Sequence, residues 1–195
     1  MTEIPATQNP THSVWRIAFN LVAACFVSGI VIAAVYYVTA PIAAVKAEEM
    51  RQASMRELVA EADSFAPVPG REGWFAAAQA GKTVAYIVPS ETRGYGGTIK
   101  MLVAVTVEGK VIDYSILEHN ETPGLGDNAQ KPKFRDQFKG KEAPHLAVVK
   151  DPGNHEDIQA MTGATISSRA VTLAVKQAVE QVDLLNRGKK GGAAK

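Results

Sequence analysis

The stretch "TGATISSRAVTLAVKQAVEQVDLLN", residues 162–186, joins a short run of small and hydroxyl side chains to a long apolar repeat. The apolar residues recur at three- and four-residue spacing, which predicts a long amphipathic helix over residues 166–186 with one face in a core. The residues of that face are Val171, Val175, Ala178, Val182 and Leu185.

Upstream of this helix, three stretches are typical of β-strands: residues 83–88, 98–107 and 111–119. The short turn "EGK" with Gly109 joins the last two, so we expect them to form an antiparallel hairpin. Further along, "KFRDQFKG" predicts a short helix and "HLAVVK" another strand. The expected fold class is α+β, with a mixed, largely antiparallel sheet and helices.

An apolar segment near the N-terminus carries no charge between Arg16 and Lys46. It exceeds the roughly 20 residues that a helix needs to cross a bilayer, and Trp15 could lie at one membrane interface. A cleaved signal peptide is the alternative, but its apolar region usually has about 7 to 15 residues. We therefore expect a single transmembrane helix over residues 15–40.

The rest of the chain divides by composition. We expect a polar tail over residues 1–14, a stalk helix and linker over 41–68, a folded domain over 69–187 and a basic tail over 188–195. Pro41 should end or kink the membrane helix. More positive charge follows the apolar segment than precedes it, so a simple count would place the domain in the cytoplasm. Interleaved glutamates make that count a weak guide.

Composition excludes several kinds of protein. A net charge of +1 and the lack of a zinc-finger or RNA-binding motif argue against nucleic acid as a partner. The single cysteine, Cys25, excludes an internal disulfide and an iron–sulfur cluster held by this chain alone. The four histidines show no metal-ligand spacing, and no GxSxG motif of a hydrolase is present. If the protein is redox-active, its carrier is organic.

Hydroxyl residues gather where the long helix should begin. Thr165, Ser167 and Ser168 could cap the helix by accepting backbone N–H groups. The same first turn offers free N–H donors and a positive dipole end, which suit a phosphate. Gly163 and Ala164 leave the approach to the Thr165 hydroxyl open. Both interpretations fit these residues.

Three motifs in a chain with one N-terminal apolar segment carry a family resemblance: "RGYGG" (93–97), "ETPGLG" (121–126) and "TGATISS" (162–168). The chain resembles the membrane FMN-binding subunits, namely the G subunit of the Rnf ion-translocating electron-transport complex and the related C subunit of the sodium-translocating NADH:quinone reductase. The "TPGLGDNAQKPKF" stretch and the "TGATISSRAV" ending are more similar to the Rnf protein.

The resemblance implies a flavin site. Thr165 would carry FMN through a phosphoester, attached by a separate flavin transferase. In this family an acid often stands where this chain has Gln159, with Asp157 nearby. Tyr95 could stack on the ring or pack in the core, and the loop "ETPGLG" could line the flavin or be an ordinary solvated connection. The remaining expected flavin contacts are Glu121, Thr122, Leu125, Thr162, Gly163, Ala164, Ser167 and Ser168.

The function that the resemblance implies is electron relay. The chain would be one component, without catalysis of its own, of a complex that couples electron transfer between ferredoxin and NAD to sodium or proton movement. It would lie in the bacterial inner membrane, contact lipid and the other subunits, and place its domain on the periplasmic face. The alternatives are the FMN-carrying component of a quinone reductase complex, and a membrane-tethered sensory or assembly module without flavin.

Overall fold

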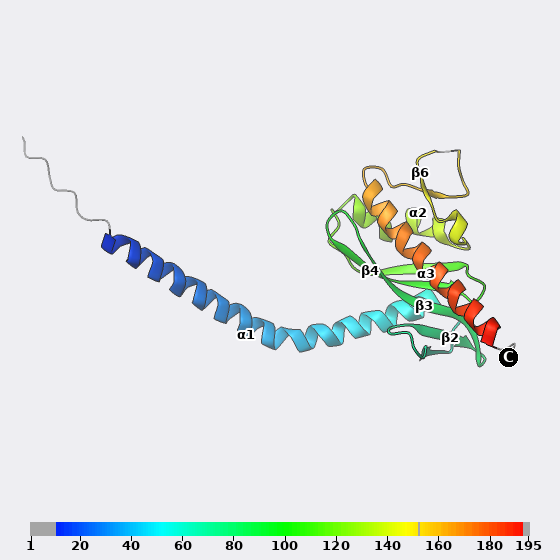
Figure 1. Cartoon of the computed structure of the whole chain (residues 1–195), viewed down its shortest axis with the longest axis horizontal. Helices are drawn as coiled ribbons and strands as arrows, with labels where there is room; N and C mark the ends of the chain where they lie inside the picture. Colours follow the sequence, from blue (N-terminus) through cyan, green and yellow to red (C-terminus); the bar gives the residue numbers. More distant parts are fainter. Residues whose placement is uncertain (1–10, 152, 193–195) are drawn as a thin grey trace, which may run out of the picture. The chain divides into compact units, whose positions relative to one another are not determined.

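The computed structural model describes residues 11–151 and 153–192 (Figure 1). The chain divides into two compact units between Glu49 and Met50. Helix α1, Thr11–Leu58, crosses that boundary. Of the expected tails, residues 1–10 and 193–195 lie outside the described residues, whereas residues 11–14 and 188–192 are helical.

The N-terminal part of α1 is the expected apolar helix. From Val14 onward it is long and apolar enough to cross a membrane, and its side chains are exposed, as at Ile17 and Phe26. It fits a single-pass membrane protein. The helix runs through Pro41 without ending there, since proline removes one backbone hydrogen bond and the flanking turns keep theirs.

The second unit contains a five-stranded antiparallel sheet in the order β1-β2-β3-β4-β5. This confirms the expected α+β class and the expected hairpin, which is β4–β5. The strands are β1 Ser64–Pro67, β2 Phe75–Gln79, β3 Lys82–Arg93, β4 Thr98–Thr106 and β5 Val111–Glu118.

Strands β1 and β2 are not among the predicted strands, and β1 lies in the segment that was expected to be the linker. The strand β2, "FAAAQ", is rich in alanine, which is depleted in strands. Its pairing with β3 depends on a tight turn in which Ala80 and Gly81 both have positive φ, 49° and 76°. Such a turn suits the twist of a hairpin.

Helix α3, Thr165–Gly192, packs on one face of the sheet, mainly against β3 and β4 (Figure 1). The expected core face of α3 is confirmed, because Val171, Val175, Ala178 and Val182 are fully buried. The C-terminal end of α1 covers the other face of the sheet with Met55 and Leu58, together with Val59 directly after it. Strand β4, beside the central strand β3, is therefore buried on both faces over residues 101–105, which explains the apolar run there.

Short elements connect β5 to α3 and position the start of α3. Phe134 and Phe138 pack edge to face, and Phe138 packs likewise on Tyr114 of β5. Two short strands, β6 and β7, then pair in parallel just before the "TGATISS" turn. The elements are η1 Gly126–Gln130, α2 Pro132–Arg135, η2 Asp136–Phe138, η3 Ala143–His145, β6 Val148–Val149 and β7 Ile158–Gln159.

Candidate functional site

A hollow of about 720 Å³ lies at the start of α3. Four segments that are distant in the sequence meet there: the β3–β4 turn, the loop after β5, the end of β6 and the turn before α3. All the predicted site residues except Thr162 and Ser168 line the hollow. The lining residues are Tyr95, Glu121, Thr122, Leu125, Gly126, Lys150, Gly163, Ala164, Thr165, Ile166 and Ser167.

The first turn of α3 has free backbone donors. The hydrogen bond that begins the helix runs from the Ser168 N–H to the carbonyl of Ala164, the residue before α3, at 2.9 Å. The N–H groups of Thr165, Ile166 and Ser167 therefore have no acceptor within the helix, and none elsewhere in the described part of the chain. These donors and the positive end of the helix dipole favour an anion at this place.

The hydroxyl groups of the turn differ in what they bind. The Ser168 hydroxyl accepts the Met161 N–H at 2.9 Å and donates to the Ala164 carbonyl at 2.8 Å. The Ser167 hydroxyl donates to a carboxylate oxygen of Glu121. Within residues 11–151 and 153–192, the half-buried Thr165 hydroxyl makes no hydrogen bond, and no hydroxyl of the turn caps an N–H of the first helical turn. Of the hydroxyl groups that line this hollow, that of Thr165 is therefore free of hydrogen bonds to the described residues, whereas that of Ser167 is bonded to Glu121.

Hydrogen bonds of Glu121 connect the loop after β5 to the β3–β4 turn and to the start of α3. Its side chain is only 6% exposed, and besides Ser167 it accepts the Gly96 N–H at 3.0 Å. A Cβ atom at Gly94 or at Gly126 would lie 2.3 Å from a carboxylate oxygen of Glu121. These glycines are therefore needed for close packing around the carboxylate, and the carboxylate itself is engaged in positioning the lining.

Leu125 and Gly163 bring the loop after β5 to the start of α3. Gly163 has a left-handed φ of 76°, and a Cβ atom built there would lie 3.1 Å from the Leu125 Cδ2 atom. Leu125, Ile166 and Tyr95 nevertheless keep 42%, 55% and 71% of their surface exposed. The hollow therefore has apolar and aromatic side chains at its open side, next to the Thr165 hydroxyl.

Lys150 is a lining residue that the sequence analysis missed. It is exposed, it follows β6, and it forms no ion pair with any described residue. Its position at the end of the predicted strand "HLAVVK" was the available signal, because side chains that follow a strand often lie at a site. Lys150 adds positive charge to a lining whose carboxylate, that of Glu121, is already hydrogen-bonded.

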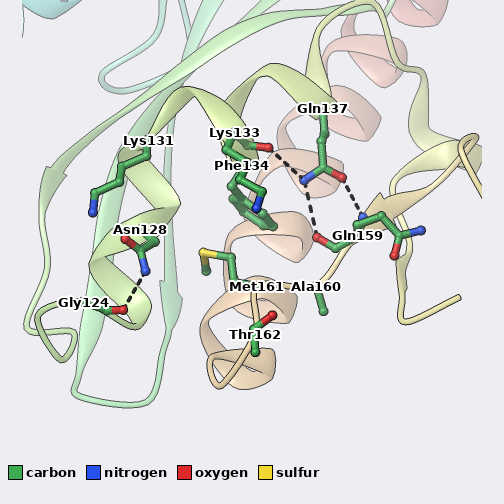
Figure 2. A pocket seen from close by; sticks show the side chains of 10 residues that line it. All are labelled: Gly124, Asn128, Lys131, Lys133, Phe134, Gln137, Gln159, Ala160, Met161 and Thr162. Atoms are coloured by element: carbon green, nitrogen blue, oxygen red, sulfur yellow. Dashed lines mark hydrogen bonds between the residues drawn. The ribbon is translucent and has the colours of Figure 1, made fainter. Parts of the chain in front are cut away.

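Thr162 lies in a second hollow, of about 470 Å³, shown in Figure 2. Gln137 and Gln159 form its hydrogen-bonded side: the Gln159 N–H donates to the Gln137 Oε1 atom at 2.7 Å. The Gln159 side-chain amide also donates to the carbonyls of Asp151 and Asn154, both at 2.6 Å. The lining comprises Gly124, Asn128, Lys131, Lys133, Phe134, Gln137, Gln159, Ala160, Met161 and Thr162.

Comparison with known proteins gives a consistent set of relatives. Residues 94–180 match the FMN-binding domain family. The G subunit of the proton-translocating ferredoxin:NAD(+) oxidoreductase complex of Clostridium ljungdahlii is 56% identical over 94% of this chain and 100% of its own length. The G subunit of the Na(+)-translocating ferredoxin:NAD(+) oxidoreductase complex of Acetobacterium woodii is 31% identical over 89% of this chain and 95% of its own length.

A solved structure is also similar. It is the crystal structure of the C subunit of the Na(+)-translocating NADH-quinone reductase from Parabacteroides distasonis, which superposes with a TM-score of 0.45 at 28% identity. The match covers 53% of this chain and 57% of that one.

Proposed function

The chain belongs to the family of G subunits of ion-translocating ferredoxin:NAD(+) oxidoreductase complexes, and we propose that it carries FMN as a phosphoester on Thr165 and relays electrons within such a complex. The chain contains an FMN-binding domain over residues 94–180. The observation that carries the proposal is the free Thr165 hydroxyl, which lies in a hollow beside unpaired N–H donors.

The lining fits FMN in size and in chemistry. A hollow of about 720 Å³ is within the range of small-molecule sites, about 300 to 1,000 Å³. The first turn of α3 and Lys150 can stabilise a phosphate by hydrogen bonds and charge. Tyr95, Leu125 and Ile166 can contact the faces of a flat ring.

Attachment requires the Thr165 oxygen to bond to phosphorus. With a flavin dinucleotide as donor, a new oxygen–phosphorus bond forms at Thr165, the bond between the two phosphates breaks, and AMP leaves with the hydroxyl proton. The turn permits this because Gly163 is exposed and has no side chain to cover the approach. A separate transferase would catalyse the step.

Within the complex, the chain's residues would hold the cofactor in place. The bound flavin supplies the electron transfer itself, while the hydrogen-bonded Glu121, the α3 turn and the loop after β5 keep its surroundings rigid. One of the two relatives named above is called proton-translocating and the other Na(+)-translocating. The coupling ion of the complex would accordingly be either a proton or sodium. The chain would act with the other subunits and have no catalysis of its own.

Replacement of Thr165 by alanine tests the proposal. We expect Thr165→Ala to fold and insert in the membrane but to lose covalent flavin, because the other hydroxyls at the α3 start are hydrogen-bonded elsewhere. The measurement is flavin fluorescence of the denatured protein in a gel after expression with a flavin transferase. Thr165→Ser, which keeps an oxygen, is the matched control and should retain fluorescence. Fluorescent Thr165→Ala would contradict the assignment.

A further inference from the structure

We propose that the second hollow, lined by Lys131 and Lys133, is the docking surface for the protein that esterifies Thr165, and that this protein presents an acidic segment to it (Figure 2). The inference rests on the proposed function, since it takes Thr165 as the acceptor. It assigns a role to a surface that the flavin itself would not occupy.

The second hollow adjoins the first. The two hollows are separated by adjacent residues: Gly124 lines the second and Leu125 the first, and Thr162 lines the second and Gly163 the first. During attachment the phosphorus of the donor must reach the Thr165 oxygen, which lines the first hollow. The protein contacts that recognise the turn must then fall on neighbouring surface, and the second hollow directly adjoins the turn through Thr162.

The second hollow has a basic part. Lys131 and Lys133 are exposed, and neither forms an ion pair with any residue that the structure describes. Some other lysines of the domain do: Lys100 pairs with Glu118 at 2.7 Å and Lys139 with Asp136 at 2.7 Å. No carboxylate lines the second hollow. The two lysines have no ion-pair partner among the described residues, and the lining contains no carboxylate. This charge favours the binding of an anionic group from another molecule.

Hydrogen bonds fix the shape of the lining of the second hollow. The Asn128 side-chain amide donates to the Gly124 carbonyl at 2.7 Å, and Gln137 and Gln159 bind each other. Buried Phe134 and half-buried Met161 form an apolar part beside these amides. A preformed surface loses little conformational freedom on binding. Apolar and basic parts side by side fit a protein segment that carries both an acidic and an apolar side chain.

The assignment also gives Thr162 a role. Thr162 is exposed and does not line the hollow that contains Thr165. On the docking surface its hydroxyl can bind the incoming protein three residues from the acceptor oxygen. Thr162 would then affect how fast flavin is attached, and not how the attached flavin behaves.

The test measures the initial rate at which the full-length chain, in detergent, gains covalent flavin from FAD and a transferase that loads the wild-type chain. The test variant is Lys131→Glu/Lys133→Glu, and the matched control is Lys82→Glu, at an exposed lysine of β3 without an ion pair among the described residues. We expect kcat/KM to fall by about tenfold or more in the double variant and to stay unchanged in the control.

Salt gives a second measurement. Added salt should slow the loading of the wild-type chain, because it screens the lysines from the acidic segment. It should have little effect on Lys131→Gln/Lys133→Gln, in which that charge is absent. The double variants, once fully loaded, should show the wild-type midpoint potential and melting temperature.

Two outcomes overturn the docking role alone: the glutamate variant loads at the wild-type rate at low salt, or it loads normally and only electron transfer in the assembled complex is slowed. The second result would assign the surface to another protein of the complex. If the wild-type chain itself gains no flavin on Thr165, by mass spectrometry of its peptides, then the proposed function fails and the docking role fails with it.

Discussion

At the scale of single residues, Glu121 joins three segments that are distant in the sequence. Its carboxylate binds the Gly96 N–H and the Ser167 hydroxyl, and its own N–H donates to the His119 Nδ1 atom at 3.1 Å. A buried carboxylate with these partners positions the β3–β4 turn against the start of α3. The lining around Thr165 therefore depends on a residue that does not need to touch the cofactor.

Gly96 tests how closely these segments pack. A Cβ atom there would lie 1.9 Å from the Asn120 carbonyl oxygen, so the backbone must shift in Gly96→Ala. We expect the free energy of unfolding to fall by about 2 kcal/mol, a typical cost of overpacking, measured by urea unfolding followed by tryptophan fluorescence. Gly188→Ala is the control: it meets nothing within 4 Å in α3 and should stabilise by up to about 1 kcal/mol. Equal stabilities of Gly96→Ala and the wild type would contradict the packing argument.

Leu125 tests whether the loop after β5 lies beside the flavin. In Leu125→Asp, a negative charge at this lining position should disfavour the anionic reduced flavin and lower its midpoint potential. For a partly exposed charge we expect the midpoint potential to fall by about 40 mV, which corresponds to about 1 kcal/mol for the transfer of one electron. Covalent attachment should persist, because Thr165 is unchanged. Leu125→Asn is the uncharged control, and a redox titration in which all three proteins overlay would exclude the loop from the ring's surroundings.

At the scale of elements, the C-terminal end of α1 belongs to the core of the second unit. Met55, Leu58 and the adjoining Val59 are buried against Ala77, Ile87, Leu102 and their neighbours on one face of the sheet, whereas the apolar side chains near the start of α1 are exposed. One continuous helix thus contains an apolar segment suited to lipid and an amphipathic end that completes a protein core. The expected stalk is in this part a structural layer of the domain.

This arrangement predicts where the domain can be cut. A fragment that begins at Met50 should unfold cooperatively, whereas one that begins at Asp63 lacks the covering side chains. Burial of Met55, Leu58 and Val59 contributes about 1.5 to 3 kcal/mol each to the free energy of unfolding. The sum is comparable to the whole stability of a domain. Thermal unfolding followed by circular dichroism compares the two fragments. The single change Leu58→Ala in the longer fragment should lower the free energy of unfolding by about 3 kcal/mol. Equal melting temperatures of the two fragments would contradict the role of α1 in the core.

At the scale of the whole molecule, the side of the membrane on which the domain lies is a separate prediction. The positive charges around the apolar helix favour the cytoplasm on a simple count. A long domain is translocated largely regardless of such charges, and the family resemblance implies the outer face. We therefore propose that the second unit lies outside the cytoplasm.

Thiol labelling in intact cells distinguishes the two orientations. In a Cys25→Ser background, Lys82→Cys places one thiol at an exposed position of the second unit. We expect a membrane-impermeant reagent to label it without lysis. A thiol introduced in place of Thr2, which precedes the apolar segment in the sequence, should react only after lysis. The reverse pattern would place the domain in the cytoplasm.

The sequence by itself determined the features that repeat along the chain. The α3 core face, the β4–β5 hairpin and the apolar helix were predictable because periodic or continuous apolar residues reflect burial within one element. The expected fold class followed from these elements, and the family from short motifs. The sequence also left two roles open for the hydroxyls at the α3 start, since a cap and a phosphate site require the same residues.

Tertiary structure decided what lies together across the chain. Only the fold shows that Thr165 is uncommitted while Ser167 and Ser168 are hydrogen-bonded elsewhere, that Thr162 belongs to another hollow, and that Lys150 joins the lining. The physical reason is that the Ser167–Glu121 contact and the lining of each hollow connect residues tens of positions apart, and even the local bonds of Ser168 each involve a single side chain, so no repeat marks them in the sequence. The weak strand β2 likewise forms because its neighbour β3 supplies the hydrogen bonds and the burial that its alanines do not favour by themselves.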